Sequence, residues 1–269
     1  MSEAIRGQAS YQESAPMPDL AHIIHSYWEF TISCDAKAPF THQVLPDGCV
    51  SLTYYRDVKK RVSWLHLVGP RMDSFGVEVR PGDLFRGVRL SPAACNVVLG
   101  CNPATLRNQI LPSSHLPPAI GSKLFELLNG SGSFEEAIAA YDLCLRSLKL
   151  MAADVDGEVA TAIRLIEANC GQVRVGDVAA AVGLSVRQLE RRFRATAGLS
   201  PKQFARIRRV RATAVKVVED GEKNWAARAT EMGYADQSHL TREFVSLIGR
   251  SPISFAEDIA QIEHGDLLK

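Results

Sequence analysis

Four side chains in the C-terminal half of the sequence have the types and spacing of a polar recognition surface. Arg187, Glu190, Arg191 and Arg194 follow one another at i, i+3, i+4 and i+7, so on a helix all four project from one face. Arginine can donate two hydrogen bonds to guanine, and glutamate can accept one from cytosine. This face therefore has the chemistry needed to read the edges of nucleic-acid bases.

A second segment further along the chain presents the same kind of surface. Ser238, Thr241, Arg242 and Val245 share one helix face by the same spacing, and Gln237 lies beside them in the first turn. Glutamine can bond adenine at two positions, whereas serine and threonine are less selective. We expect this segment to form a second base-reading surface.

The residues around each surface predict a helix, a tight turn and a second helix. In the first unit Gly183 supplies the turn and Ser185 caps the next helix, with Gln188 at the reciprocal position of a capping box. Asp236 is the corresponding cap in the second unit. The apolar positions expected to face the core are Val178, Ala179, Val182, Leu189, Phe193 and Ala197 in the first unit and Leu240, Phe244 and Ile248 in the second.

An internal repeat links the two units. Residues 193–204, with the pattern Phe-x4-Gly-x-Ser-Pro-x-x-Phe, recur as residues 244–255 at an offset of 51. A repeat at fixed offset predicts two copies of one supersecondary unit. Helix-turn-helix units place the exposed face of their second helix in the major groove of DNA, so the repeat predicts two reading helices on one chain.

A connecting helix is predicted between the copies. Ser200 and Pro201 form an N-cap followed by a favoured first helical residue, and the helix continues to about Glu219 before Asp220-Gly221 ends it. Some 19 residues at about 1.5 Å each span roughly 28 Å, close to the roughly 34 Å that separates successive major-groove segments on one face of DNA. One chain can therefore dock both reading helices on one side of a duplex.

Residues 157–258 resemble the DNA-binding domain of AraC-type (AraC/XylS) transcriptional regulators, which carries two helix-turn-helix units on a connecting helix. The matching text is Gly183-Leu184-Ser185, Leu189-x3-Phe193, Gly198-x-Ser200-Pro201 and Gly233-Tyr234-x-Asp236-Gln237-Ser238-His239-Leu240-x-Arg242-x-Phe244-x4-Gly249-x-Ser251-Pro252. The sequence departs from the family at Arg228, where an aliphatic residue is usual, and Trp225 is the candidate to supply the missing core volume.

The resemblance implies which residues contact DNA. The base-reading positions of the family fall on Arg187, Glu190, Arg191, Gln237, Ser238, Thr241 and Arg242. We expect phosphate contacts or support from Ser185, Arg194, Arg208, Arg209 and His239. For Arg206, Arg208, Arg209 and Arg211 on the connector, pairing with acidic side chains is the alternative to phosphate contact.

Charge is distributed unevenly. The formal net charge of the chain is only +1, from 31 basic and 30 acidic residues, which taken as a whole argues against a nucleic-acid partner. Residues 185–216 nevertheless contain ten basic residues and a single acid, Glu190. Such a window suits phosphate, although the acids around it predict modest non-specific affinity for DNA.

The N-terminal half predicts strands. Tyr27–Ile32, Val50–Tyr55, Val62–Val68 and Leu84–Leu90 are rich in β-branched and aromatic residues and are separated by Gly and Pro turns. Helices are expected over 118–128 and 134–150. The segments 45–48, 67–70 and 87–92 resemble a strand-rich, cupin-like N-terminal domain often attached to such regulators, which implies a sensor or dimerisation role.

The expected fold is therefore an α+β, two-domain chain. Residues 1–150 form a β-rich domain, a barrel or sandwich with helices at its end, and residues 151–269 form an all-α domain with helix-turn-helix units at about 174–199 and 224–250. No apolar run reaches 18 residues and the N-terminus lacks a signal arrangement, so a cytoplasmic, nucleoid-associated protein without membrane contact is expected.

Metal and redox sites are not indicated by the sequence. The histidines His22, His25, His42, His66 and His115 lack the spacing of a metal-binding cupin, and the six cysteines form no Cys-x-x-Cys pair. We expect no metal and no cofactor, with the cysteines as buried apolar residues. Arg89, which lies among apolar residues, predicts either a structural ion pair or a contact to an anionic ligand.

The sequence thus predicts a sequence-specific DNA-binding transcriptional regulator, activator or repressor, and not an enzyme. Its expected partner is promoter double-stranded DNA, with a small-molecule effector, RNA polymerase and a second copy of the chain as further candidates; no ligand-binding residue is assigned. Two alternatives remain at this point: a small-molecule-binding module with a vestigial DNA domain, and a DNA-repair alkyltransferase-type protein, whose paired zinc-binding cysteines the spacing does not supply.

Overall fold

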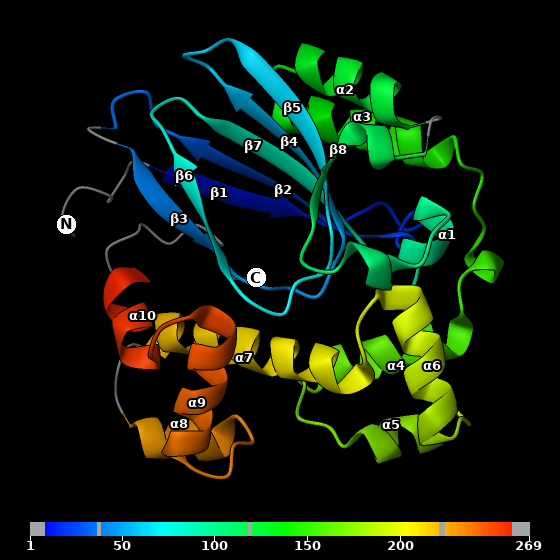
Figure 1. The fold of residues 1–269 in the computed structure, drawn as a ribbon, viewed down its shortest axis with the longest axis vertical. Helices are drawn as coiled ribbons and strands as arrows, with labels where there is room; N and C mark the ends of the chain where they lie inside the picture. The colour runs from blue at the N-terminus through cyan, green and yellow to red at the C-terminus, as the bar shows by residue number, and fades with distance from the viewer. Residues whose placement is uncertain (1–8, 37–38, 118–119, 221–223, 260–269) are drawn as a thin grey trace.

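The strands and helices occupy different parts of the chain. The computed structural model describes residues 9–36, 39–117, 120–220 and 224–259. Strands fill the N-terminal part as far as residue 112, and the helices follow almost entirely C-terminal to them (Figure 1). The expected class, a strand-rich N-terminal part followed by helices with two helix-turn-helix units, is confirmed. Of the predicted features, Pro118 and Gly221 lie outside the described residues.

Among the described residues, the main sheet has six antiparallel strands in the order β1-β2-β7-β4-β5-β8. Their bounds are β1 Ala9–Ser14, β2 Ile24–Ile32, β4 Ser51–Asp57, β5 Val62–Val68, β7 Leu84–Leu90 and β8 Ile110–Pro112. A two-stranded sheet, β3 (Phe40–Val44) with β6 (Phe75–Val79), faces it (Figure 1). A small apolar cluster around Phe30 and Val79 packs between the two sheets. The N-terminal part is therefore a pair of facing sheets of unequal size.

The predicted strands all exist, but others were missed. Val62–Val68 and Leu84–Leu90 have the bounds of β5 and β7, and the other two predicted strands lie within or next to β2 and β4. The short or peripheral strands β1, β3, β6 and β8 were not predicted. Edge strands bury less of their surface, so their sequences carry a weaker apolar alternation.

Successive side chains of the central strands serve opposite faces of the main sheet. On one face Trp28 and Phe30 turn toward the smaller sheet, while Tyr27 and Glu29 turn toward two helices, α2 (Gly121–Gly130) and α3 (Phe134–Arg146). The helix α3 begins at Ser133, whose hydroxyl accepts from the Glu136 amide at 3.2 Å, as expected for a cap. A further short helix, α1 (Cys95–Leu99), follows β7.

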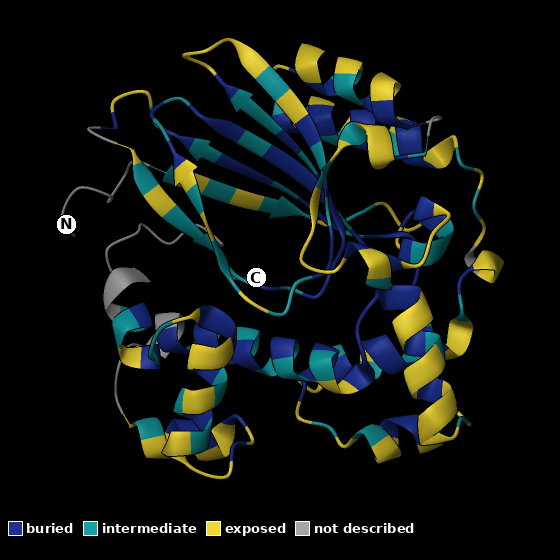
Figure 2. Ribbon diagram, in the orientation of Figure 1, coloured by how far each residue is buried: buried dark blue, intermediate teal, exposed yellow. Residues whose placement is uncertain are grey.

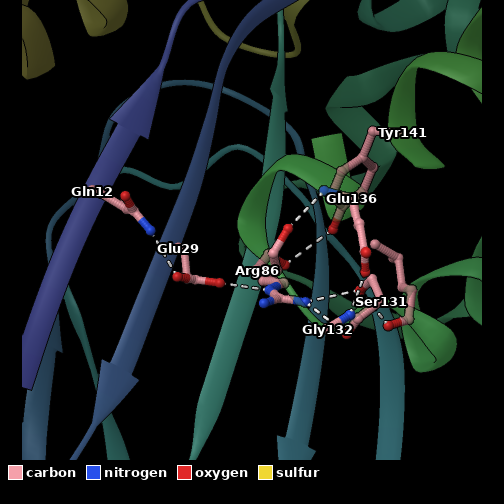
Figure 3. Close-up of polar contacts among 9 residues, drawn as sticks. Gln12, Glu29, Arg86, Ser131, Gly132, Glu136 and Tyr141 are labelled. Atoms are coloured by element: carbon pink, nitrogen blue, oxygen red, sulfur yellow. Dashed lines mark hydrogen bonds and ion pairs between the residues drawn. The ribbon is translucent and has the colours of Figure 1, made fainter. Parts of the chain in front are cut away.

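A buried ion pair crosses the helix-covered face of the sheet. Arg86 donates through Nε to Glu29 at 2.6 Å and through Nη1 to the Ser131 hydroxyl at 2.8 Å (Figure 3). Gln12 donates to the other Glu29 oxygen at 2.8 Å, and the Tyr141 hydroxyl donates to the Arg86 carbonyl at 3.0 Å. These contacts join strands β1, β2 and β7 to both covering helices.

In the part of the C-terminal region that the structure describes, residues 151–220 and 224–259, there are seven α-helices. They are α4 Gly157–Ala168, α5 Val175–Ala181, α6 Val186–Ala197, α7 Pro201–Asp220, α8 Trp225–Glu231, α9 Gln237–Ile248 and α10 Pro252–Ile259. The long helix α7 runs beneath the sheets and carries α4–α6 at one end and α8–α10 at the other (Figure 1). One apolar core runs without interruption from Leu20 beside the sheet to Phe255 in α10.

Candidate nucleic-acid interface

The first helix-turn-helix unit consists of α5, a turn at Gly183 and α6. The Ser185 hydroxyl accepts from the Gln188 amide at 3.3 Å, and the Ser185 amide donates to Gln188 Oε1 at 2.9 Å, which completes the predicted capping box. Leu189, Phe193 and Ala197 are buried, as predicted. The amphipathic pattern of α6 therefore fixes which of its faces remains outside.

The outer face of α6 holds the predicted base-reading residues. Arg187, Glu190, Arg191 and Arg194 are all exposed, and exposed residues line the outer sides of α6 and α9 (Figure 2). The structure therefore brings these four side chains to one free surface. Their contacts with bases or phosphates remain predictions.

The second unit consists of α8, a turn at Gly233 and α9. Asp236 Oδ1 accepts from the His239 amide at 2.7 Å, so Asp236 is the predicted N-cap. Leu240, Phe244 and Ile248 are buried. On the outside, Gln237, Ser238 and Arg242 are exposed and Thr241 is half-buried.

His239 and Arg228 are held within the second unit. His239 Nδ1 accepts from the Ala235 amide at 3.3 Å, and its ring meets Tyr234 edge-on with centroids 5.4 Å apart. These contacts hold the ring at the start of α9, which fits a supporting role, and phosphate contact stays a prediction. Arg228 is buried in α8 at 7% exposure, while Trp225 is half-buried and packs against the core. The unit therefore accommodates the departure from the family pattern.

Both reading helices present their N-terminal ends to the same side of the molecule. The C-terminal ends of α6 and α9 point toward the sheets, and their N-terminal ends point away from them (Figure 1). N-terminal residues of a recognition helix are the ones that reach base edges. The 20 residues of α7 between the units span about 30 Å at about 1.5 Å per residue, close to one turn of DNA.

The connector arginines are engaged within the chain. Arg206 pairs with Glu243 of α9, Nη2 to Oε1 at 2.9 Å, and Arg208 lies 3.7 Å from Glu167 of α4. Arg209 donates to the Gly233 carbonyl at 3.1 Å and stacks over the Tyr234 ring. The acid-pairing alternative is therefore seen for Arg206 and Arg208. A phosphate role for the half-buried Arg208 and Arg209 stays a prediction.

A groove between the two units contains a residue that sequence reasoning missed. It has a volume of about 610 Å³ and its lining includes Asn169, Gln172, Arg174, Arg209 and Gly233. Arg174 is exposed at the start of α5 and brings a cation to this groove. A lone arginine before a short helix gives no sequence signal, because only the fold places it in the groove.

Arg89 of β7 forms the structural ion pair that was one of its two predicted roles. Its guanidinium contacts Asp47 and Glu13, each at 2.6 Å, and the Tyr11 hydroxyl at 3.0 Å. Burial alone would raise the pKa of Asp47, but the guanidinium groups of Arg89 and Arg211 hold it below its usual value. The Arg89 side chain thus fastens β1 and the loop before β4 to the sheet.

A cavity of about 340 Å³ lies beside Arg89, between the sheet and α7. Its lining includes His25 and Ser26 from β2 and Arg208 and Arg211 from α7. Desolvation lowers the pKa of His25, so its imidazole is predominantly neutral at pH 7. Desolvation, followed by the nearby Arg89, also lowers the pKa of Arg211. The cavity therefore brings together three arginines from both parts of the chain and the carboxylates of Glu13 and Asp47.

The other histidines and the cysteines are scattered. The His42 ring stacks on Phe30 with centroids 4.4 Å apart, and His22 Nε2 lies 3.3 Å from the Leu150 carbonyl oxygen. Within the described residues, no three His, Cys, Asp or Glu side chains converge as a metal site would require. All six cysteines are free thiols, and the expectation that they are buried is wrong for Cys34, Cys101 and Cys170, which are exposed.

Two family models match separate parts of the chain. Residues 178–258 match a family described as "Helix-turn-helix domain", and residues 12–112 match one described as "Domain of unknown function (DUF6597)". The C-terminal helices are an AraC-type helix-turn-helix domain, as the sequence motifs predicted. The strand-rich N-terminal part matches a separate family model, whose description gives no function.

Solved structures similar to the chain include two described as transcriptional regulators and one described as ToxT. A probable AraC family transcriptional regulator from Rhodopseudomonas palustris is 22% identical, with a TM-score of 0.35 over 38% of this chain and 96% of its own. One from Chromobacterium violaceum is 23% identical, with a TM-score of 0.35 over 40% and 95%. ToxT from Vibrio cholerae is 12% identical, with a TM-score of 0.43 over 92% and 98%.

No curated protein matches the chain. Among the helices that the structure describes, none is long and apolar enough to cross a membrane.

Proposed function

We propose that this chain, which carries an AraC-type helix-turn-helix domain, is a transcriptional regulator that binds specific sequences in promoter DNA. The observation that carries the proposal is the placement of α6 and α9, whose exposed polar N-terminal halves face the same side, away from the sheets (Figure 1). The length of α7 supports two base-reading contacts that lie about one helical turn of DNA apart. The function is recognition and not catalysis.

Base readout is assigned to the exposed faces of the two reading helices. In α6, Arg187 and Arg191 suit guanine and Glu190 suits cytosine. In α9, Gln237 suits adenine, Arg242 suits guanine, and Ser238 and Thr241 give less selective contacts. Arg194 lies one turn further along α6 and is assigned to phosphate, with Ser185 fixing the start of the helix.

The sheet domain is assigned the regulatory role. We take residues 1–150 as this domain and residues 151–269 as the DNA-binding domain. A small anionic effector is supported by the cavity between the sheet and α7. Arg208 and Arg211 of α7 line it with Arg89, so its three arginines exceed its two carboxylates, Glu13 and Asp47, which both pair with Arg89. A second copy of the chain and RNA polymerase are the further proposed partners.

The DNA proposal is tested by selecting bound sequences from a random pool of duplexes. We expect enrichment of a bipartite motif, with affinity that falls as salt rises because phosphate contacts release counterions. Arg191→Ala and Arg242→Ala should each cost about 1–3 kcal/mol and relax the preference at one base position. Arg164→Ala, an exposed arginine on α4, is the matched control.

Two results would contradict the proposal. One is a selection that yields no enriched sequence, and the other is binding of the Arg191 and Arg242 variants as tight as that of the Arg164 control. The effector is tested separately by the thermal stabilisation of the protein with a panel of small carboxylates and phosphates. A stabilising compound should lose its effect in the Arg211→Ala variant, and a panel without any such compound counts against an anionic effector.

A further inference from the structure

The C-terminal ends of the two reading helices are in contact with one loop assembly of the sheet domain. We call this assembly, residues 69–75 and 103–109, the brace. Its first segment follows β5, and its second includes the 3-10 helix Pro103–Leu106. It spans from the end of α6 to the end of α9, so it joins the two helix-turn-helix units by a route separate from α7.

The two segments of the brace are bonded to each other along their length. The Gly69 amide donates to the Gln109 carbonyl at 3.0 Å, and the Asn108 amide donates to the Pro70 carbonyl at 3.1 Å. Arg71 donates to the Asn108 carbonyl at 3.3 Å and lies over the Phe75 ring. Backbone and side-chain hydrogen bonds therefore join the two loops into one unit.

One end of the brace abuts the last residue of α6. Gly198 is the left-handed cap of that helix, with φ of 78°. A Cβ atom at this position would lie 2.8 Å from the backbone of Pro103 and 3.0 Å from the Pro70 ring. The contact is so close that only glycine fits, so α6 has no freedom to move toward the brace.

The other end of the brace caps α9. The last carbonyls of a helix lack partners within the helix. Here the Ser74 amide donates to the Leu247 carbonyl at 2.8 Å and the Ser74 hydroxyl donates to the Ile248 carbonyl at 2.7 Å. Gln43 of β3 donates to the same Ile248 oxygen at 3.3 Å, and Arg250 donates to Gln43 at 3.0 Å.

The two attachment points are equivalent positions of the internal repeat. Gly198 and Gly249 are 51 residues apart, which is the offset of the repeat, and both are left-handed caps. A helix-turn-helix unit fixed to α7 alone can still rotate about that helix. A second attachment at each cap removes that rotation, since two separated links define a relative orientation.

We propose that the brace is a spacing gauge that sets the separation and relative orientation of α6 and α9. The consequence for DNA rests on the proposed function. Gln43 and Ser74 then determine which half-site spacing the protein accepts, although neither residue touches DNA. The sheet domain thereby contributes to DNA specificity through geometry.

The first test measures the geometry without DNA. Spin labels are attached at Ala195→Cys in α6 and Ser246→Cys in α9, two exposed positions that are equivalent in the repeat, after Cys34, Cys101 and Cys170 are changed to Ser. We expect one narrow distance peak in the parent protein. The Gln43→Ala/Ser74→Ala variant should broaden that peak. The control Gln109→Ala/Ser114→Ala should not, because it removes two matched but exposed side chains and keeps the Gln109 backbone carbonyl that bonds Gly69.

The second test compares affinity for the selected DNA site with affinity for the same site carrying one inserted base pair between its halves. Loss of the Gln43 and Ser74 side-chain bonds should reduce the preference for the correct spacing by about tenfold, which corresponds to about 1.4 kcal/mol. The Gln43→Ala variant alone, which keeps both Ser74 bonds to α9, should show a smaller reduction and guards against misfolding of the double variant.

A distance peak as narrow in the double variant as in the control overturns the proposal. So does a broadened peak with an unchanged spacing preference. If the parent protein prefers no DNA sequence, the proposed function fails, while the label distances still decide whether the brace fixes the two units.

Discussion

Arg192 and Asp156 form a two-point ion pair between the first reading helix and the start of α4. Arg192 Nε lies 2.7 Å from Asp156 Oδ2, and Nη2 lies 2.5 Å from Oδ1. Asp156 also caps α4 by accepting from the Val159 amide at 3.0 Å. The Asp156 carboxylate thus caps α4 and also holds Arg192 of α6. Arg192 therefore faces α4 and does not belong to the exposed base-reading face of α6.

Removing this carboxylate should destabilise the C-terminal helices. Asp156→Ala takes away the cap of α4 and one of the two acids that face Arg192, and we expect a loss of about 2–3 kcal/mol in the free energy of unfolding. Glu158→Ala removes the more exposed partner and should cost about 0–1 kcal/mol. Urea denaturation measures both, and equal losses would contradict the double role of Asp156.

Removing only one partner of the Arg86–Glu29 ion pair should strongly destabilise the fold. Arg86→Met leaves Glu29 charged in a site where its side chain is 11% exposed, so we expect a loss of about 3–5 kcal/mol. Glu29→Met leaves the Arg86 charge and should cost a similar amount. The double variant should lose less than the sum of the two, as measured by chemical denaturation. Strict additivity would show that the pair is not coupled.

Acid should weaken the contact between the two sheets through His42. Burial lowers the pKa of His42 to about 4 from an ordinary value of 6.5. The unfolded chain therefore binds this proton first as the pH falls, so the contribution of neutral His42 to stability is lost progressively from about pH 6.5 to about pH 4. His42→Gln should reduce the drop in the urea midpoint over this window. An unchanged drop would assign the acid sensitivity to other groups.

Contacts to phosphate and contacts to bases should differ in how strongly they make the DNA affinity depend on salt. Arg194→Ala should weaken binding to all sequences alike and lower the slope of log affinity against log salt by about one unit. Arg191→Ala should instead weaken binding to the selected site more than to random DNA. Fluorescence anisotropy at several salt concentrations distinguishes the two. The same slope change and the same selectivity in both variants would contradict the assigned roles.

The parts of the fold that depend on local pattern could be predicted from the sequence. The caps Ser185 and Asp236, the buried Leu189 and Phe244 and the long connector all follow from spacing within one or two helical turns. The strands β5 and β7 were found because central strands are apolar and lie between clear turns. These features need no knowledge of distant residues.

The features that join distant residues could not be predicted. The acids that hold Arg192 and Arg206 lie more than thirty residues away along the chain, so counting charge within a window overstated the cations free for DNA. The brace has no sequence signal either, because Ser74 bonds backbone carbonyls, which every residue possesses. The interface between the sheets and the helices is set by tertiary packing alone.

The uninterrupted apolar core runs from the sheet to α10. On the proposed function, it would tie promoter occupancy to the folding equilibrium of the whole chain. A ligand that binds only the folded state stabilises everything that unfolds together with its site. Operator DNA should therefore raise the melting temperature of the strands as well as that of the helices that touch it. By the same linkage, a destabilising change deep in the sheet lowers the number of molecules competent to occupy a promoter, and abundant DNA partly offsets that loss.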